Sequence, residues 1–299
     1  MKKLLSVLVL AMVATTLVFA SGQAEDAALG TEQNPVIWSF VPSGDTQEIV
    51  AGGEAVADMI YDKTGIVVDI SVATEYAGVI EALSADPPSA HMASLATFAY
   101  IVAAERGVAE AELVAVRFGS PTYNGQIIAR TDSDINTVED LEGKTFARPD
   151  AFSTSGWIIP SITMRAEGVN PDEDLDEIVD AGAHPAVVAA VYNGDVDAGA
   201  TYVDARGTIE EDNPDVMEVI KIVTVSQDIP NDGVQFHPSV PDEMRQEIIE
   251  ALLEIAEENP DALDDAYSWT GLVERDDAFY DPFRQTLQAA GVSPQQFMD

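Results

Sequence analysis

Apolar residues along the chain fall into short compact runs, separated by longer segments in which they recur at helical spacing. Compact runs are typical of buried strands, and helical spacing is typical of helices packed on one face. In the first part of the chain the predicted strands are Pro35–Phe40, Ile66–Ile70, His91–Leu95, Leu113–Phe118 and Gln126–Arg130, and the predicted helices are Gln47–Asp62, Tyr76–Leu83 and Phe98–Glu105. This alternation predicts an α/β fold with a mostly parallel sheet.

The same alternation restarts after Arg130. The predicted strands here are Thr145–Ala147, Asp197–Thr201 and Val219–Val225, and the predicted helices are Thr137–Gly143, one that begins at Ser153 and one from His184 to Gly194. From Pro241 onward, an apolar stripe between Met244 and Ile255 predicts a helix, and the aromatic-bearing tail from Asp261 to Phe297 is predicted to be helical as well.

Two α/β units followed by a helical return predict a two-lobed clamshell. Lobe one is expected to contain residues 34–126 and 233–299, and lobe two residues 127–232. The chain is then expected to cross between the lobes near Arg130 and over Val225–Asp232. A cleft between two lobes is a common place for a small ligand to bind.

The charge of the chain excludes several classes of partner. Its 299 residues include 14 Lys and Arg against 53 Asp and Glu, a formal net charge of −39. Such a surface repels nucleic acid and anionic membranes, so neither is expected as a partner. It also repels small anions at long range, so any anion site must consist of local donors and dipoles.

The N-terminus has the pattern of an export signal. Lys2 and Lys3 precede the apolar run Leu4–Phe19, and Val18-Phe19-Ala20 fits a cleavage site, so residues 1–20 are predicted to be a signal peptide and residues 21–33 a flexible leader. The chain has no cysteine, which excludes disulfides, thiolate metal sites and a lipid-anchored N-terminus. The mature chain is expected to be periplasmic or otherwise extracytoplasmic, without membrane insertion.

One stretch, Asp150-Ala-Phe-Ser-Thr-Ser-Gly156, combines three consecutive hydroxyl residues with the predicted start of a helix. Free backbone N–H groups and hydroxyls at a helix start can bind a tetrahedral oxyanion. His184 precedes Pro185 and is predicted to cap a second helix start. Both features also have an ordinary structural explanation, because such residues commonly cap helices.

Several blocks in this region resemble the phosphate/phosphite/phosphonate-binding proteins of ABC importers. The resemblance extends over about Pro35 to Asp299 and rests on Asp140–Ala147, Asp150, Ser153–Gly156, Gly182–His184, Ala186–Val191 and Gly194–Ala200. It implies a type II-like periplasmic-binding-protein fold that closes on a phosphorus oxyanion and presents it to an ABC permease. Ala151 and the segment Ser94–Thr97 depart from the usual family pattern, and they leave the choice of ligand open.

The resemblance also implies a set of binding residues. The oxyanion would be held by the hydroxyl and N–H groups of Ser153, Thr154 and Ser155 and by the imidazole of His184. Two tyrosines, Tyr76 and Tyr123, would line the cleft. Two acids, Asp204 and Asp232, match positions that contact a ligand amine. The tyrosines could instead pack between elements. With 53 acids, finding an acid near any chosen position is easy.

The expected function is capture of a phosphorus oxyanion without catalysis, cofactor or metal. The binding protein is expected to be a monomer, and its binding mechanism is expected to need no formal positive charge. Two alternatives stay open: a sensory ligand-binding subunit of the same fold, and an exported hydrolase that uses Ser153 and His184. The hydrolase is disfavoured because no nucleophile elbow surrounds Ser153 and the three histidines lack metal-ligand spacing.

Overall fold

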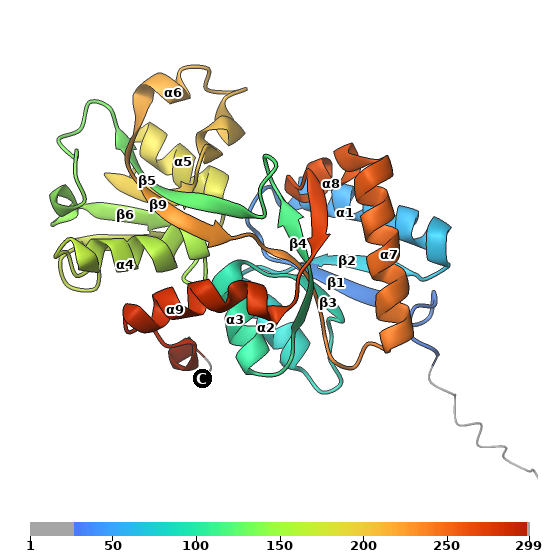
Figure 1. The fold of residues 1–299 in the computed structure, drawn as a ribbon. Coiled ribbons are helices and arrows are strands. Elements are labelled where there is room, and N and C mark those ends of the chain that lie inside the picture. Colours follow the sequence, from blue (N-terminus) through green and yellow to red (C-terminus); the bar gives the residue numbers. More distant parts are fainter. Residues whose placement is uncertain (1–26, 298–299) are drawn as a thin grey trace, which may run out of the picture.

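Runs of β-branched and aromatic residues form two separate sheets, each covered by helices, in a computed structural model that describes residues 27–297 (Figure 1). The two sheets belong to two lobes that lie side by side. The predicted signal peptide and residues 21–26 of the predicted leader lie outside the described residues.

The sheet of lobe one has six strands in the order β11-β4-β10-β3-β1-β2. These strands are β1 (Val36–Phe40), β2 (Val68–Val72), β3 (Met92–Ser94), β4 (Glu110–Val116), β10 (Gly233–Phe236) and β11 (Gly271–Glu274). Strand β1 is parallel to β2 and β3, whereas β10 and β11 run antiparallel to their neighbours. The sheet is therefore mixed, and its parallel part comes from the region where strands and helices alternate.

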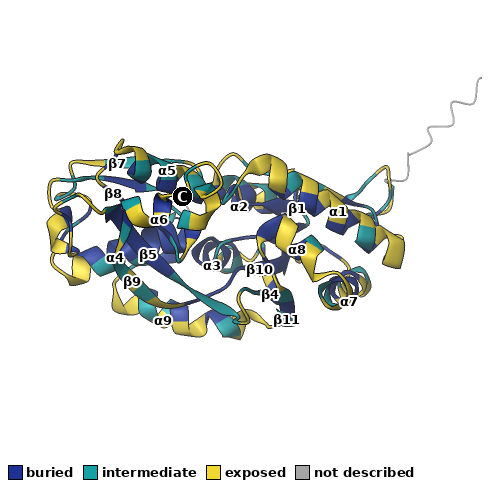
Figure 2. Cartoon of the chain, turned by 90° about the horizontal axis from the view of Figure 1, so that it is seen from above, coloured by how far each residue is buried: buried dark blue, intermediate teal, exposed yellow. Residues whose placement is uncertain are grey.

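Helices cover this sheet on both faces, with their buried sides turned toward it (Figure 2). The helices of lobe one are α1 (Thr46–Thr64), α2 (Tyr76–Ser84), α3 (Thr97–Glu105), α7 (Asp242–Glu258), α8 (Pro260–Tyr267) and α9 (Asp281–Ala289), of which α9 extends away from the sheet, beneath lobe two (Figure 1). Local chemistry defines the ends of α1: Asp45 accepts the N–H groups of Gln47 and Glu48, and Gly65 ends the helix at φ 76°.

The sheet of lobe two has five strands in the order β7-β6-β8-β5-β9. They are β5 (Thr122–Arg130), β6 (Thr145–Arg148), β7 (Glu177–Asp180), β8 (Ala198–Tyr202) and β9 (Ile220–Pro230). The helices of this lobe are α4 (Ile159–Ala166), α5 (His184–Asn193) and the short α6 (Val216–Val219). The predicted helix over residues 137–143 is only a short 3-10 turn, Glu139–Leu141.

The chain passes between the sheets twice, from β4 to β5 and from β9 to β10. Strand β5 pairs with β9 from Thr122 to Arg130 and with β8 from Gly125 to Ala129. The predicted lobe boundary after residue 126, and the crossing expected near Arg130, therefore fall inside a strand of lobe two. The first crossing lies at residues 117–121, because a tight turn at Arg117–Ser120 separates β4 from β5.

The C-terminal region is not wholly helical as predicted. Strand β11 interrupts it and adds an edge to the lobe-one sheet by pairing with β4. Beyond α9, the 3-10 turn Pro294–Phe297 packs the Phe297 ring against Phe98 of lobe one at 4.9 Å and Phe152 of lobe two at 5.4 Å between ring centroids. The end of the described chain thus contacts both lobes.

Candidate ligand-binding site

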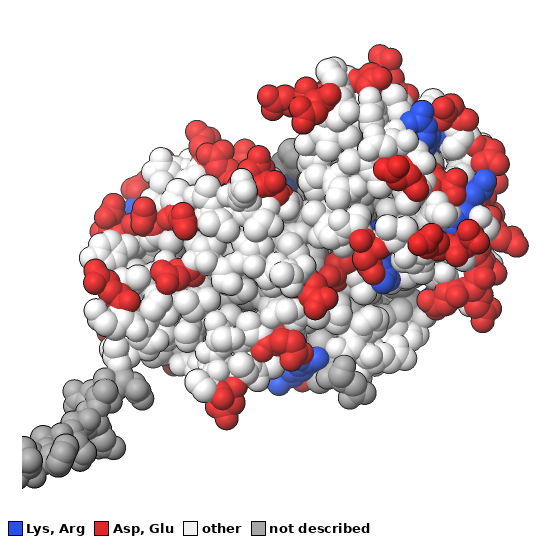
Figure 3. All heavy atoms as spheres, turned by 180° about the vertical axis from the view of Figure 1, so that it is seen from behind, with Lys and Arg blue, Asp and Glu red and all other residues white. Residues whose placement is uncertain are grey.

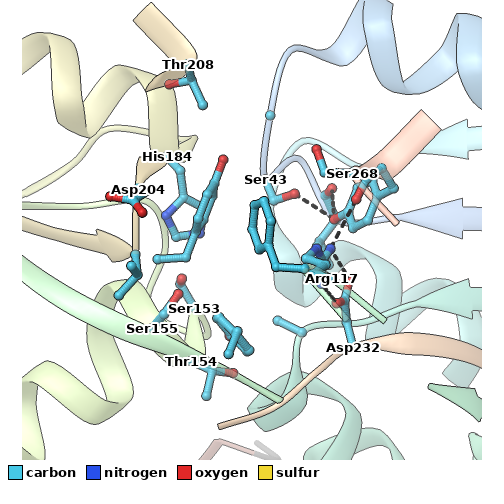
Figure 4. Close-up of a pocket in the computed structure, with 18 of the residues that line it drawn as sticks. Ser43, Arg117, Ser153, Thr154, Ser155, His184, Asp204, Thr208, Asp232 and Ser268 are labelled. Carbon is cyan, nitrogen blue, oxygen red and sulfur yellow. Dashed lines mark hydrogen bonds and ion pairs between the residues drawn. The ribbon is translucent and has the colours of Figure 1, made fainter. Parts of the chain in front are cut away.

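A cavity of about 730 Å³ lies between the lobes, and side chains from both of them line it (Figure 4). Every residue that the sequence singled out lies in this lining: Tyr76, Tyr123, Ser153, Thr154, Ser155, His184, Asp204 and Asp232. Segments more than 150 residues apart in the chain therefore meet at one cavity.

The hydroxyl run begins a helical segment, as predicted, but through a wide π turn over Thr154–Ile158 that continues into α4. Ser153 is its N-cap and accepts the N–H of Gly156 at 3.2 Å. A Cβ on Gly156 would lie 2.3 Å from the Pro149 ring, so this close approach requires glycine. We call Ser153, Thr154 and Ser155, all at most 2% exposed, the hydroxyl cradle.

Two hydroxyls of the cradle accept hydrogen bonds from backbone N–H groups. The Thr154 hydroxyl accepts the N–H of Phe98, at the start of α3, at 2.9 Å. Thr154 and Ser153 both act as acceptors toward protein N–H groups, so each hydroxyl keeps its own proton as a donor, which for Ser153 can go to the Tyr76 phenol or to a ligand. Ser155 lies against Gly125 of β5, where a Cβ would be 3.1 Å from the Ser155 carbonyl oxygen.

His184 is the first residue of α5, and Ala183, not His184 as predicted, occupies the cap position. Its Nδ1 lies 2.7 Å from the Thr201 hydroxyl. Burial, assisted by the charge of Arg117, lowers the pKa of His184 to about 3, so the imidazole is neutral at neutral pH. When Thr201 donates to Nδ1, the proton is on Nε2, which then acts as a donor.

Tyr76 is buried and Tyr123 is half-buried, and both phenols stay protonated. Burial raises the pKa of Tyr76 well above its ordinary value and raises the pKa of Tyr123 to about 12. Interactions with the Ser153 hydroxyl for Tyr76 and with the Ser155 hydroxyl for Tyr123 partly oppose these shifts. Both phenols therefore lie beside the hydroxyl cradle and add O–H groups to it.

Three hydrogen bonds tie the cradle region of lobe two to lobe one. Thr154 receives the Phe98 N–H, the Asp150 carboxylate accepts the N–H of Tyr76 at 3.1 Å, and the N–H of His184 donates to the Ser43 carbonyl at 3.1 Å. The segments that would bind an anion are thus also the segments that hold the lobes together.

Sequence reasoning missed a cation in the cavity. Arg117 lines it and forms a bidentate ion pair with Asp232, with 3.2 Å between Nη2 and Oδ2 (Figure 4). Burial opposes the charge of Arg117, but the Asp232 carboxylate outweighs it and the pKa of Arg117 is raised. Because Asp232 neutralises this guanidinium, the expectation that binding needs no formal positive charge stays a prediction. The available signal was a scarce basic residue at a strand end shortly before Tyr123.

The remaining acids lie at the rim of the cavity. Asp204 is exposed, in a left-handed conformation at φ 64°, with Arg206 3.4 Å away. Further exposed acids in the lining are Asp45, Glu48, Asp228, Asp264 and Asp265. On the surface seen from behind, acidic side chains form scattered groups and basic side chains are few (Figure 3). Donors deep in the cavity attract an anion, whereas the acids at the rim repel it.

The arrangement does not resemble a hydrolytic centre. The Nδ1 of His184 contacts the Thr201 hydroxyl rather than a carboxylate, so no Ser–His–Asp relay is formed around Ser153. Among residues 27–297, no group of three or more His, Asp or Glu side chains could hold a metal ion. What the geometry provides is a set of convergent hydrogen-bond donors.

A two-lobed α/β fold with buried donors in the interlobe cleft defines the class of periplasmic-type solute-binding proteins. Residues 38–280 match the family described as "ABC transporter, phosphonate, periplasmic substrate-binding protein", and the chain belongs to this family.

Individual relatives agree with this assignment. The "Phosphate-import protein PhnD" of Mycolicibacterium smegmatis is 32% identical over 172 residues, which are 54% of this chain and 53% of the relative. The chain thus spans little more than half the length of the curated relatives that it matches.

Solved structures share the fold. A binding protein component of an ABC phosphonate transporter from Pseudomonas aeruginosa has a TM-score of 0.78 at 22% identity, covering 86% of this chain and 87% of that one. PhnD1 from Prochlorococcus marinus in complex with methylphosphonate has a TM-score of 0.72 at 12% identity, covering 86% and 98%.

Proposed function

We propose that this protein is the exported solute-binding component of an ABC importer, which captures a phosphorus oxyanion in the interlobe cleft and delivers it to the permease. The observation that carries this proposal is the convergence of the buried hydroxyl cradle, the neutral His184 and the phenols of Tyr76 and Tyr123 on one cavity. Family membership and the methylphosphonate complex of the Prochlorococcus relative support the choice of ligand class.

Binding depends on oriented donors more than on net charge. A tetrahedral oxyanion offers three oxygens, and hydroxyls, an imidazole N–H and helix-start N–H groups can surround them. Each hydrogen bond to a charged group contributes about 1.5–3 kcal/mol. In a closed cleft with little water these dipoles act at a lower effective dielectric than in bulk solvent.

Export and delivery complete the proposal. Residues 1–20 serve as a cleaved signal peptide, and the mature protein acts as a monomer outside the cytoplasm. Among the described residues, no helix has the length and apolar character required to cross a bilayer. The lobes are residues 27–116 with 233–297, and residues 122–230; their closure around the ligand presents both rims to the permease.

The two other functions are less well supported. Catalysis by Ser153 and His184 lacks a carboxylate partner for the imidazole. A sensory subunit uses the same fold, and it differs only in the membrane protein that receives the closed form. Copurification with a permease, rather than with a receptor, separates import from sensing.

The function is tested by thermal unfolding of the mature protein with phosphate, phosphite, methylphosphonate and 2-aminoethylphosphonate, with sulfate as the control anion. A ligand at 100 times its Kd stabilises the native state by about 2.7 kcal/mol. At least one phosphorus oxyanion is expected to raise the Tm, with sulfate inactive. No shift with any of the four, or release of product from them, contradicts the proposal.

A further inference from the structure

The wall of the cavity opposite the hydroxyl cradle carries the ion pair of Arg117 and Asp232 (Figure 4). The two side chains are only 19% and 11% exposed. The guanidinium also donates to the Asn231 side-chain oxygen at 3.1 Å and to the Tyr267 carbonyl at 3.1 Å. The N–H bonds of both terminal nitrogens and both carboxylate oxygens are therefore engaged.

The backbone holds this pair in place. Arg117 begins the turn at the first crossing between the lobes, and it exchanges two backbone hydrogen bonds of 3.0 Å with Ser120. The Asn231 amide, at the second crossing, donates to the Ser120 carbonyl at 3.1 Å and to the Ala115 carbonyl at 3.0 Å. The two crossing segments are thus bonded to each other on either side of the ion pair.

An oxyanion in the hydroxyl cradle directs its fourth phosphorus substituent away from the cradle, toward the opposite wall. There Arg117 neutralises the charge of the Asp232 carboxylate and occupies one acceptor site on each of its oxygens, which weakens its attraction for a ligand ammonium group. The other acids of the lining are exposed, where water screens their attraction for a cation. The lobe-one lining also includes the apolar side chains Val41, Ile49 and Ala266, and Phe118 of the first crossing segment adds another apolar side chain to the cavity lining.

We infer that Arg117 is a specificity-determining residue, which stands where a ligand ammonium would otherwise pair with Asp232 and so selects phosphorus oxyanions with a small uncharged substituent. This inference rests on the proposed function and revises one expectation from the sequence. Asp232 acts through Arg117, and it is not a receptor for a ligand amine.

The test is calorimetry with methylphosphonate and 2-aminoethylphosphonate, two ligands that differ at the substituent. The wild-type protein is expected to bind methylphosphonate at least tenfold more tightly. Arg117→Met releases the Asp232 carboxylate and is expected to move the affinity ratio at least tenfold toward 2-aminoethylphosphonate.

A matched control is Arg206→Met, which releases the exposed acid Asp204 instead and is expected to change the ratio less than threefold. The double variant Arg117→Met with Asp232→Asn leaves no unpaired buried charge, so it still tests the inference if the single variant fails to fold. It is expected to keep the wild-type preference for methylphosphonate.

Three outcomes overturn the inference. They are equal wild-type affinities for the two ligands, a change of the affinity ratio in Arg206→Met as large as that in Arg117→Met, and a change of the ratio toward 2-aminoethylphosphonate in the double variant. Each of these leaves the proposed function intact, because a phosphorus oxyanion still binds. Absence of binding by every phosphorus oxyanion refutes the proposed function itself.

Discussion

Ser155→Ala is the most direct test of the hydroxyl cradle. The other two cradle hydroxyls also have structural roles, because Ser153 caps its own helical turn and Thr154 accepts a hydrogen bond from the Phe98 N–H of lobe one. Ser155 is 2% exposed and interacts with the Tyr123 hydroxyl, so its loss removes one donor from the cavity.

The expected loss follows from one hydrogen bond to a charged oxygen. That bond contributes about 1.5–3 kcal/mol, which corresponds to a Kd about 10-fold to 150-fold higher. The assay is calorimetric titration with the phosphorus oxyanion that gives the largest thermal shift, at neutral pH. The free energy of unfolding, measured in urea without ligand, is expected to change by less than about 1 kcal/mol.

Ser161→Ala is the matched control. Ser161 is a buried serine of α4 that donates to the Ile158 carbonyl at 2.9 Å and does not line the cavity. Its substitution is expected to cost some stability and to leave the Kd within twofold of the wild type. If Ser155→Ala also stays within twofold, or if both variants lose affinity equally, the cradle does not bind the oxyanion as reasoned here.

Three further predictions concern His184, the contact between the lobes and the cradle backbone. The pKa of His184 falls from 6.5 to about 3 on folding, so the contribution of the neutral imidazole to stability is complete above pH 6.5. Below pH 6.5 the free energy of unfolding is expected to decline by about 1.4 kcal/mol per pH unit. Urea unfolding of His184→Gln should lack this slope. Asp150→Asn weakens the acceptor for the Tyr76 N–H, so calorimetry should show roughly threefold to tenfold weaker binding; unchanged affinity would exclude a role in closure. Gly156→Ala creates a steric clash that should cost at least about 2 kcal/mol in urea unfolding, whereas Gly207→Ala, with open space around it, should cost under about 1 kcal/mol; equal costs would refute the argument.

Periodicity alone predicted much of the architecture, because many elements have strong local patterns. Strand β1 and helices α1 and α7 lie close to their predicted ranges, with Asp45 and Gly65 marking the ends of α1. Strand β10 has only four residues and β11 follows a helical stretch, so neither has a local signal. Both form because pairing with β4 satisfies their backbone groups.

The candidate site was likewise predictable only where its residues are neighbours in the sequence. Ser153, Thr154 and Ser155 are consecutive, and a helix start with hydroxyls is a pattern that can be recognised in one short window. The partner of Asp232 is 115 residues away in the chain. No spacing rule connects Arg117 to it.

The sequence by itself determined that the chain forms α/β units and that one helix start carries clustered hydroxyl donors, since both depend on neighbouring residues. Only the tertiary structure decided the charge inside the cleft. The crossing segments at residues 117–121 and 231–232 come together through strand pairing, and this places a guanidinium beside a carboxylate opposite the hydroxyl cradle. Long-range pairing of this kind depends on the assembled sheets, which local patterns do not specify.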